Sequence, residues 1–232
     1  GKYIFEELKN FLKKNNLIKK EWNALNLLAQ NASTVGAIDL KLMSCDNLNN
    51  FIFFDKLEKN EFKFLYLLKS DNLSFKKKDE FIVYQGSHGD KGAEVADVIL
   101  PSPAYTEENG FFLNLEGRIQ ECRKATYPTG ESLEDWKIFN LILKNLNSKN
   151  LIESYADLRK EALNEIPNFS DINELPETNF MDEEKISSKF YEEKIVIESI
   201  DYYFTNAISR SSKTMSECKR ARSLELKDGT NN

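Results

Sequence analysis

Residues 81–120 constrain the fold of this chain more than any other stretch. Two short apolar runs, FIVY at 81–84 and VIL at 98–100, flank a segment that is rich in glycine. Short runs of β-branched and aromatic residues bounded by glycine and proline predict buried strands. Since glycine has no Cβ atom, its repetition between the two runs predicts a tight strand-to-helix turn. The glycines in question are Gly86, Gly89 and Gly92.

The neighbouring segments extend this pattern into an α/β arrangement. An aromatic and aliphatic run at 62–68 (FKFLYLL) predicts a strand before the central stretch, and residues 111–115 predict one after it. Residues 92–96 predict a short helix between the strands at 81–84 and 98–100. A strand, a helical piece and a strand in succession favour a parallel sheet whose strands are buried on both faces.

Helices are predicted where apolar residues recur every three or four positions. Ser132 is the predicted N-cap of the most regular helix, with Asp135 three residues later as in a capping box, and Ser154 is the predicted N-cap of the next. Gly36 is the predicted stop of an earlier helix. The predicted helices cover residues 3–16, 21–34, a short piece before Asn60, 132–147, 154–166 and 209–222.

The domain organisation is predicted from composition along the chain. Residues 1–166 form one predicted α/β domain, and 167–223 form an extended segment and a terminal helix that pack on this domain or on a partner. Residues 168–184 contain acidic clusters and Pro176 with few apolar side chains, which is typical of an extended crossing segment. Residues 224–232 are a predicted disordered tail.

Composition excludes several classes of function. The net charge of -6 and the pI of about 5.2 argue against a nucleic-acid partner, because phosphates are neutralised by basic surfaces. No run approaches the roughly 20 apolar residues that a membrane span needs. Cys45, Cys122 and Cys218 lie far apart, so neither a disulfide framework nor a Cys-x-x-Cys metal site is predicted. Gly1 in place of an initiator methionine indicates a processed or partial chain.

The glycine segment is the first candidate for chemistry, because phosphate-binding loops follow strands in this way. A dinucleotide fingerprint has the spacing G-x-G-x-x-G, whereas this chain has G-x-x-G-x-x-G with Asp90 inside it. A carboxylate among the amides would repel a phosphate. His88, the sole histidine, could act as a base oriented by Asp90, but Ser87 beside it lacks the context of a nucleophile. A turn histidine is the favoured interpretation.

Other acidic side chains have simpler interpretations. Glu107 and Glu108 are adjacent in a turn and point away from each other, so a solvated turn is favoured over a carboxylate pair. Glu116 and Arg118 flank Gly117 at the end of a predicted strand, and a structural ion pair is the default interpretation.

The central stretch resembles a known family. Its motifs are Tyr84-Gln85-Gly86, His88-Gly89-Asp90, ADVILP at 96–101, AYTE at 104–107 and Asn114-x-Glu116-Gly117-Arg118-x-Gln120, with Asp135-Trp136-Lys137 and Ile208-Ser209-Arg210 further on. In order and spacing they resemble the molybdopterin-oxidoreductase-like domain of the large iron-sulfur subunit of respiratory complex I, the NADH:ubiquinone oxidoreductase, and most closely its mitochondrial form. The resemblance covers residues 20–222.

The resemblance implies a non-catalytic structural part of the complex I peripheral arm, on the matrix side of the mitochondrial inner membrane. The chain has no cysteine cluster, so the iron-sulfur clusters are expected in a partner that supplies the N-terminal part of the subunit. No cofactor, metal or catalytic residue is expected here. The alternatives are a diverged oxidoreductase fragment that binds molybdopterin or a dinucleotide, and a free-standing interaction module. The family motif residues expected to be structural are Gly86, His88, Gly89, Asp90, Gly92, Asp97, Pro101, Glu107, Asn114, Glu116, Gly117 and Arg118.

Overall fold

A computed structural model describes residues 2–19, 22–29, 32–40, 42, 50–165, 172–176 and 201–227. Its contacts group the chain into two compact units, each of which we describe by itself. The hairpin unit comprises Gly1–Ser44, Gly110–Cys122 and Ser154–Ile197, and the sheet unit comprises Cys45–Asn109, Arg123–Glu153 and Glu198–Asn232. The predicted boundary between residues 166 and 167 lies outside the described residues.

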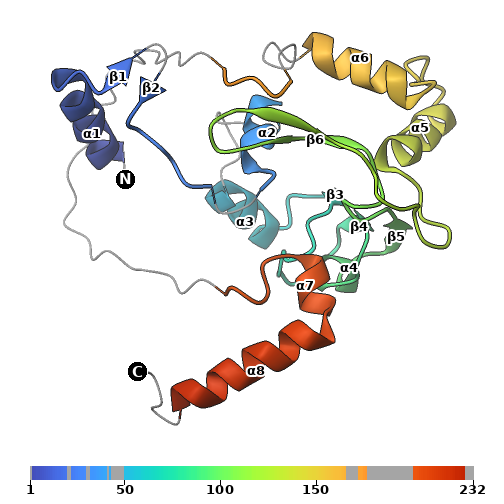
Figure 1. Ribbon diagram of the computed structural model, residues 1–232. Coiled ribbons are helices and arrows are strands. Elements are labelled where there is room, and N and C mark those ends of the chain that lie inside the picture. The colour runs from blue at the N-terminus through green and yellow to red at the C-terminus, as the bar shows by residue number, and fades with distance from the viewer. Residues whose placement is uncertain are drawn as a thin grey trace. The chain divides into compact units, whose positions relative to one another are not determined.

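The sheet unit contains a three-stranded parallel sheet, as the sequence predicts. The strands β3 (Phe64–Leu68), β4 (Phe81–Gly86) and β5 (Val98–Pro101) lie in that order, with β4 in the centre (Figure 1). The predicted short helix between β4 and β5 is confirmed as the single turn α4 (Lys91–Glu94). Parallel pairing brings the carboxyl ends of all three strands to one edge of the sheet.

One face of this sheet forms the larger core. Leu65 and Leu67 of β3 lie beside Ile82 and Tyr84 of β4, and all four are buried with Leu57 of α3 (Asn50–Glu58). Alternate residues of a strand point to the same face, which explains why these four contribute together. The α3 helix confirms the short helix predicted before Asn60.

The other face of the sheet is only partly covered. The ring of Tyr66 packs 5.7 Å from that of Phe139, which lies on α5 (Asp135–Asn145). Nearer the amino ends of the strands, Phe64 and Phe81 stack on each other at 6.3 Å but remain 55% and 48% exposed. Burial on both faces is therefore confirmed for β4 from residue 82 onward. It is wrong at these two phenylalanines and for β5, where Val98 and Ile99 are 39% and 54% exposed.

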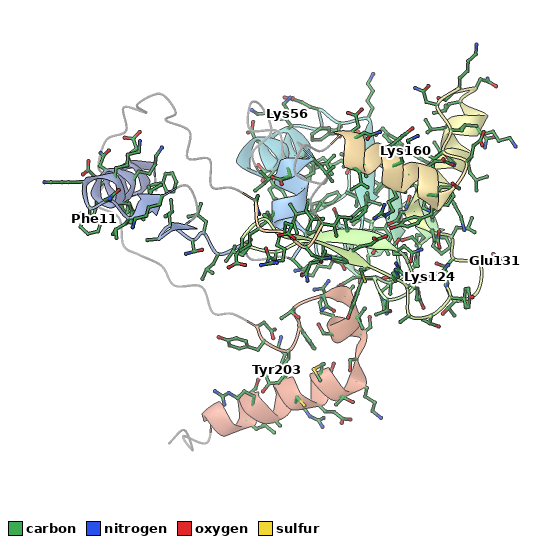
Figure 2. All side chains as sticks on the ribbon, turned by 45° about the horizontal axis from the view of Figure 1, so that its top comes forward. Phe11, Lys56, Lys124, Glu131, Lys160 and Tyr203 are labelled. Atoms are coloured by element: carbon green, nitrogen blue, oxygen red, sulfur yellow. The ribbon has the colours of Figure 1, made fainter. Side chains whose placement is uncertain are left out.

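The start of α5 differs from its predicted start. The helix begins at Asp135 with Glu134 as N-cap, while the Ser132 hydroxyl has no hydrogen-bond partner among the described residues. The Glu134 carboxylate accepts from Lys124 Nζ at 3.0 Å and from Trp136 Nε1 at 2.8 Å. These bonds hold Glu134 in an extended conformation at the cap position. Figure 2 shows Lys124 and Glu131 in the loops that precede the helix.

The C-terminal helix is divided in two. α7 (Ala207–Ser211) and α8 (Lys213–Lys227) are separated by Ser212, whose ψ of 122° is extended. Asn206 and Ser209 form a capping box at the start of α7. Since α8 reaches Lys227, the first four residues of the predicted tail are helical, and 228–232 lie outside the described residues.

The hairpin unit is built on an antiparallel pair, β6 (Gly110–Leu113) and β7 (Ile119–Cys122). The predicted strand at 111–115 thus ends at Leu113, because the next residues form the hairpin turn. Leu113 and Ile119 are buried against side chains of α2 (Thr34–Asp39) and α6 (Tyr155–Glu165). The predicted cap of α6 is confirmed, since Ser154 Oγ accepts from the backbone N–H of Asp157 at 3.2 Å.

The first residues of the chain contain one confirmed helix and one that is wrong. α1 (Lys2–Lys14) matches the helix predicted at 3–16, but 22–29 form no helix. A short antiparallel pair, β1 (Ile18–Lys19) and β2 (Trp22–Asn23), takes up the start of the predicted helix. Leu28 is 86% exposed, so this member of the expected stripe does not supply the buried contact that would stabilise a helix. α2 instead begins at Thr34 and contains the predicted stop residue Gly36.

One prediction concerns residues that are largely outside the described part. Of the extended segment at 168–184, only 172–176 are described, and they are not helical. Among the described residues, no helix is both long and apolar enough to cross a lipid bilayer.

Candidate functional site

The glycine loop after β4 is folded around a side chain of its own strand. The Tyr84 ring is 2% exposed, and its hydroxyl donates to the carbonyl oxygen of His88 at 2.8 Å. A Cβ atom on Gly86 would lie 2.5 Å from Tyr84 Cζ, and one on Gly92 would lie 2.9 Å from Tyr84 Cε2. A Cβ atom on Gly89 would meet nothing within 4 Å. Gly86 is therefore required by the closeness of the Tyr84 ring, and Gly92 by that ring together with the carbonyl oxygen of Ser70, which would lie 2.5 Å from its Cβ atom.

This geometry differs from the glycine-rich turn of a dinucleotide-binding fold. In a dinucleotide-binding turn, glycines leave room for the backbone to approach the pyrophosphate, and a helix N-terminus faces it. Here the Tyr84 ring fills the space beside Gly86 and Gly92, and α4 is a single turn capped by Asp90. In the part of the chain that the structure describes, no three His, Cys, Asp or Glu side chains are placed to hold a metal ion.

The negative charge of Asp90 is balanced by the guanidinium of an arginine that is distant in sequence. Arg210 of α7 donates from Nε to Asp90, and its Nη2 lies 3.0 Å from Oδ1 of Asp71. Asp90 Oδ1 also accepts from the backbone N–H of Lys91 at 2.9 Å. Figure 1 shows α7 beside α4, where this contact is made. The arginine thus ties the C-terminal helices to both the glycine loop and the loop after β3.

The stability of this contact should depend on pH. Burial raises the pKa of Asp90, but the hydrogen bonds from Arg210 and Lys91 outweigh it and hold the pKa below its ordinary value of 3.8. The ionised carboxylate therefore stabilises the fold above pH 3.8, and this contribution is lost as the pH falls through the lower folded pKa. Urea unfolding of wild type and Asp90→Asn should show a gap in stability at pH 6 that closes at low pH. A gap independent of pH would contradict the assignment.

The predicted turn histidine is in a polar surrounding. His88 Nδ1 lies 2.9 Å from Ser87 Oγ, and the carboxylate of Asp90 is engaged by Arg210 and Lys91. The alternative of His88 as a base oriented by Asp90 is not supported, because the Asp90 carboxylate has other partners.

Three further motif residues form hydrogen bonds with backbone groups of the sheet unit. Asp97 Oδ2 accepts from Ile82 N–H at 2.8 Å, while Asp97 N–H donates to the Ile82 carbonyl at 2.8 Å, so the residue fastens the start of β5 to β4. The carbonyl of Pro101 accepts from Leu133 N–H at 3.3 Å. Glu107 accepts from Ala104 N–H at 3.0 Å and from Thr129 Oγ1 at 3.2 Å.

The remaining motif residues build the turn of the β6–β7 hairpin. Asn114 Oδ1 accepts from the backbone N–H groups of Glu116, at 3.0 Å, and Arg118, at 2.9 Å. Gly117 has a φ of +83°, a left-handed conformation that favours glycine. The Arg118 guanidinium donates to the carbonyl of Asn173. Each of these features fixes the conformation of the backbone.

A polar cluster at the carboxyl ends of β3 and β4 was not anticipated from the sequence. Gln85 is fully buried, accepts from Tyr66 Oη, and donates to Asp135 Oδ1 at 2.7 Å. Lys69 Nζ lies 2.8 Å from Asp135 Oδ2 and also bonds Glu108. The signal that could have revealed it is the polar residue at the end of each parallel strand, because these ends meet at one edge. We call these five residues the edge cluster.

The ionisable side chains of the edge cluster are paired with one another and are not arranged for proton transfer. Burial lowers the pKa of Lys69, but the carboxylates of Asp135 and Glu108 outweigh it, and the net pKa is raised. Burial raises the pKa of Glu108 and exceeds the opposing effect of Lys69. A lysine with a raised pKa stays protonated and is neither base nor nucleophile at neutral pH. Lys69 also has a φ of +49°, so the cluster holds it in a conformation that costs a non-glycine residue energy.

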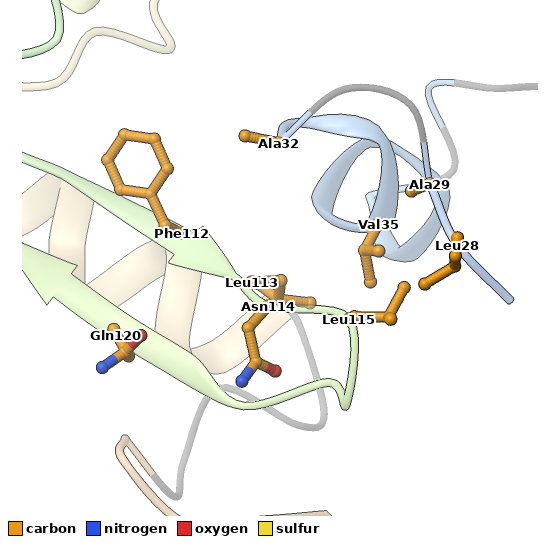
Figure 3. A pocket seen from close by; sticks show the side chains of 9 residues that line it. All are labelled: Leu28, Ala29, Ala32, Val35, Phe112, Leu113, Asn114, Leu115 and Gln120. Carbon is orange, nitrogen blue, oxygen red and sulfur yellow. The ribbon is translucent and has the colours of Figure 1, made fainter. Parts of the chain in front are cut away.

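A small cavity lies in the hairpin unit. It has a volume of about 320 Å³ and an apolar lining. In Figure 3, Val35 of α2 projects between Leu113 and Leu28, with Leu115 of the hairpin turn beside Leu28. The polar side chains of Asn114 and Gln120 border it without any charged group. The cavity offers shape and apolar contact but no reactive side chain.

Comparisons with known proteins cover most of the chain. The family model described as molybdopterin oxidoreductase matches residues 1–145, and the model of the C-terminal region of NADH-ubiquinone oxidoreductase G matches residues 172–218.

Three relatives illustrate the similarity. The chain is 37% identical over 221 residues to the NADH-ubiquinone oxidoreductase 75 kDa subunit of Reclinomonas americana, covering 94% of this chain and 32% of that protein. It is 38% identical over 219 residues to the mitochondrial NADH-ubiquinone oxidoreductase 78 kDa subunit of Candida albicans, covering 89% and 29%. It is 35% identical over 233 residues to the mitochondrial 78 kDa subunit of Neurospora crassa, covering 96% and 29%. The chain thus spans about a third of the length of these relatives.

Proposed function

The chain belongs to the molybdopterin oxidoreductase family, and from this membership we propose that it is a non-catalytic, structural part of the large subunit of respiratory complex I. The match of residues 172–218 to the C-terminal region of NADH-ubiquinone oxidoreductase G supports this proposal, as do relatives that are named as subunits of that oxidoreductase. Within the complex, the chain stabilises the peripheral arm through which electrons pass from NADH to ubiquinone.

The observation that carries the non-catalytic part of this proposal is the position of Tyr84. Its ring fills the space beside Gly86 and Gly92, where a dinucleotide-binding turn would need room for the pyrophosphate. The charged groups nearby are engaged with one another, since Arg210 binds Asp71 and Asp90. The alternative of an oxidoreductase fragment that binds a dinucleotide is not favoured by this geometry.

We further propose a location for the chain and a partner polypeptide. Because two of the relatives are named as mitochondrial, its place is the mitochondrial inner membrane, on the matrix side, as part of the assembled complex. Its partner is a polypeptide that carries the cysteine-rich, cluster-binding part of the subunit, and this chain itself holds no cofactor. It binds the other subunits of the peripheral arm through protein contacts.

Native electrophoresis of mitochondrial membranes tests the assignment. A tagged full-length chain should migrate with NADH dehydrogenase activity in the band of intact complex I, and depletion of the chain should reduce that band and its activity together. Migration apart from the activity would refute the proposal. Stoichiometric molybdenum, tungsten or pterin in the purified chain would instead support the oxidoreductase, and so would tight nucleotide binding that Gly89→Glu abolishes.

A further inference from the structure

An apolar groove runs along α5 in the sheet unit. It has a volume of about 510 Å³, within the range of sites that bind ligands, and its floor is made of leucine and isoleucine side chains. Leu133, Leu141 and Leu151 are 41%, 50% and 40% exposed, so the apolar surface faces solvent. We call it the leucine groove; its apolar members are Leu133, Leu141, Leu151 and Ile152.

The far wall of the leucine groove is fixed by one side chain of α5. Asn140 Oδ1 accepts from the backbone N–H of Ile152 at 3.1 Å, and Asn140 Nδ2 donates to the Ile152 carbonyl. Both polar backbone groups of Ile152 are therefore satisfied inside the chain, which leaves the wall apolar toward the groove. A wall that is fixed before binding lowers the entropic cost of receiving a partner.

Two lysines of α5 and one glutamate of the following segment line the groove. Lys137 and Lys144 lie on its rim, seven residues apart on α5, which is two helical turns or about 10.5 Å. Lys137 is 3.4 Å from Glu134, and Lys144 is in the last turn of the helix. Glu153, in the segment that follows α5, also lines the groove. An apolar floor with positive rim charges two turns apart matches an amphipathic helix with acidic residues at the same spacing.

We propose that the leucine groove binds an amphipathic helix of another protein chain, one whose apolar stripe is bordered by acidic side chains seven residues apart. Apolar residues of that helix fill the space between Leu141 and Leu151, and its carboxylates face Lys137 and Lys144. The rim charges set its register and direction, because rim pairs contribute more to specificity than to affinity. This binding does not depend on the chain's place in complex I.

A designed helical peptide tests the groove in the full chain. Its leucines recur at three- and four-residue intervals and two glutamates stand seven residues apart; isothermal titration measures its binding. We expect micromolar affinity for wild type and a loss of at least about tenfold in Leu141→Asp. Leu146→Asp is the matched control, since Leu146 is at the end of the same helix, 71% exposed and outside the groove. Circular dichroism checks that both variants are folded.

Charge reversal tests the orientation of the peptide. Lys144→Glu should weaken binding several-fold and should recover it for a peptide with lysines in place of its glutamates, whereas Lys149→Glu, outside the groove, should change neither. Binding that survives Leu141→Asp, equal affinity of acidic and basic peptides for wild type, or no binding at about 1 mM peptide would overturn the proposal. Dimers of the chain that Leu141→Asp dissociates would overturn it too, because the occupant would be a second copy.

Discussion

Replacing Gly92 with alanine should lower the free energy of unfolding by about 3 kcal/mol, as expected for overpacking in a dense interior. The new Cβ atom would lie 2.5 Å from the carbonyl oxygen of Ser70 and 2.9 Å from the Tyr84 ring. The first of these is backbone, which cannot turn aside as a side chain can, so the loop after β3 or the α4 turn must shift. Urea unfolding followed by circular dichroism measures the loss.

Gly89 supplies the control in the same loop. A Cβ atom at Gly89 meets nothing within 4 Å, so Gly89→Ala should change stability by less than about 0.5 kcal/mol. Gly86→Ala should be costly in wild type and much less so in a Tyr84→Leu background, because the three atoms nearest to its Cβ atom all belong to the Tyr84 side chain. Equal effects at Gly89 and Gly92 would show that close packing around Gly92 does not constrain the loop.

Replacing Arg210 with methionine should cost about 2–3 kcal/mol and loosen the C-terminal helices. The side chain is 16% exposed and faces the carboxylates of Asp71 and Asp90, which would be left close together without a cation. Removing one partner of a largely buried ion pair is costly for this reason, and partial exposure of the carboxylates reduces the cost. Thermal unfolding measures the loss, and limited proteolysis should cut within residues 201–227 sooner than in wild type.

Arg222→Met is the matched substitution for Arg210→Met. Arg222 is exposed on α8, so its replacement should stay within about 0.5 kcal/mol of wild type. If the two variants unfold alike and resist protease alike, the contact from α7 to the glycine loop carries no stability, and the C-terminal helices are held by other interactions.

The strands of the sheet unit were predictable from sequence because each is a short, dense run of apolar residues. The observed strands fall within or around the predicted ranges; they are Phe64–Leu68, Phe81–Gly86 and Val98–Pro101. Their parallel pairing follows from the helical turn between two of them. Capping of α6 by Ser154 was also predictable, because it depends on residues that are neighbours in the sequence. The helix predicted at 21–34 was wrong because its stripe needed a packed partner, and Leu28 has none that buries it.

The candidate site was predictable only in part. Sequence spacing and Asp90 argue against a phosphate loop, but the crowding of this loop by the ring of Tyr84 is revealed by no spacing. The edge cluster joins Gln85 to Asp135 across 50 positions. Arg210 and Asp90 are 120 positions apart. Interactions at such separation leave no periodic signal in the chain.

The sequence by itself determined the strand runs, the glycine loop and the family motifs, because these depend on residues that are neighbours along the chain. Only the tertiary structure decided what the glycines are for. The small size of Gly86 and Gly92 makes room for a tyrosine of the preceding strand, and Arg210 from the far end of the chain balances the acid between them. The physical reason is that steric exclusion and charge pairing act between atoms close in space, whatever their distance in sequence.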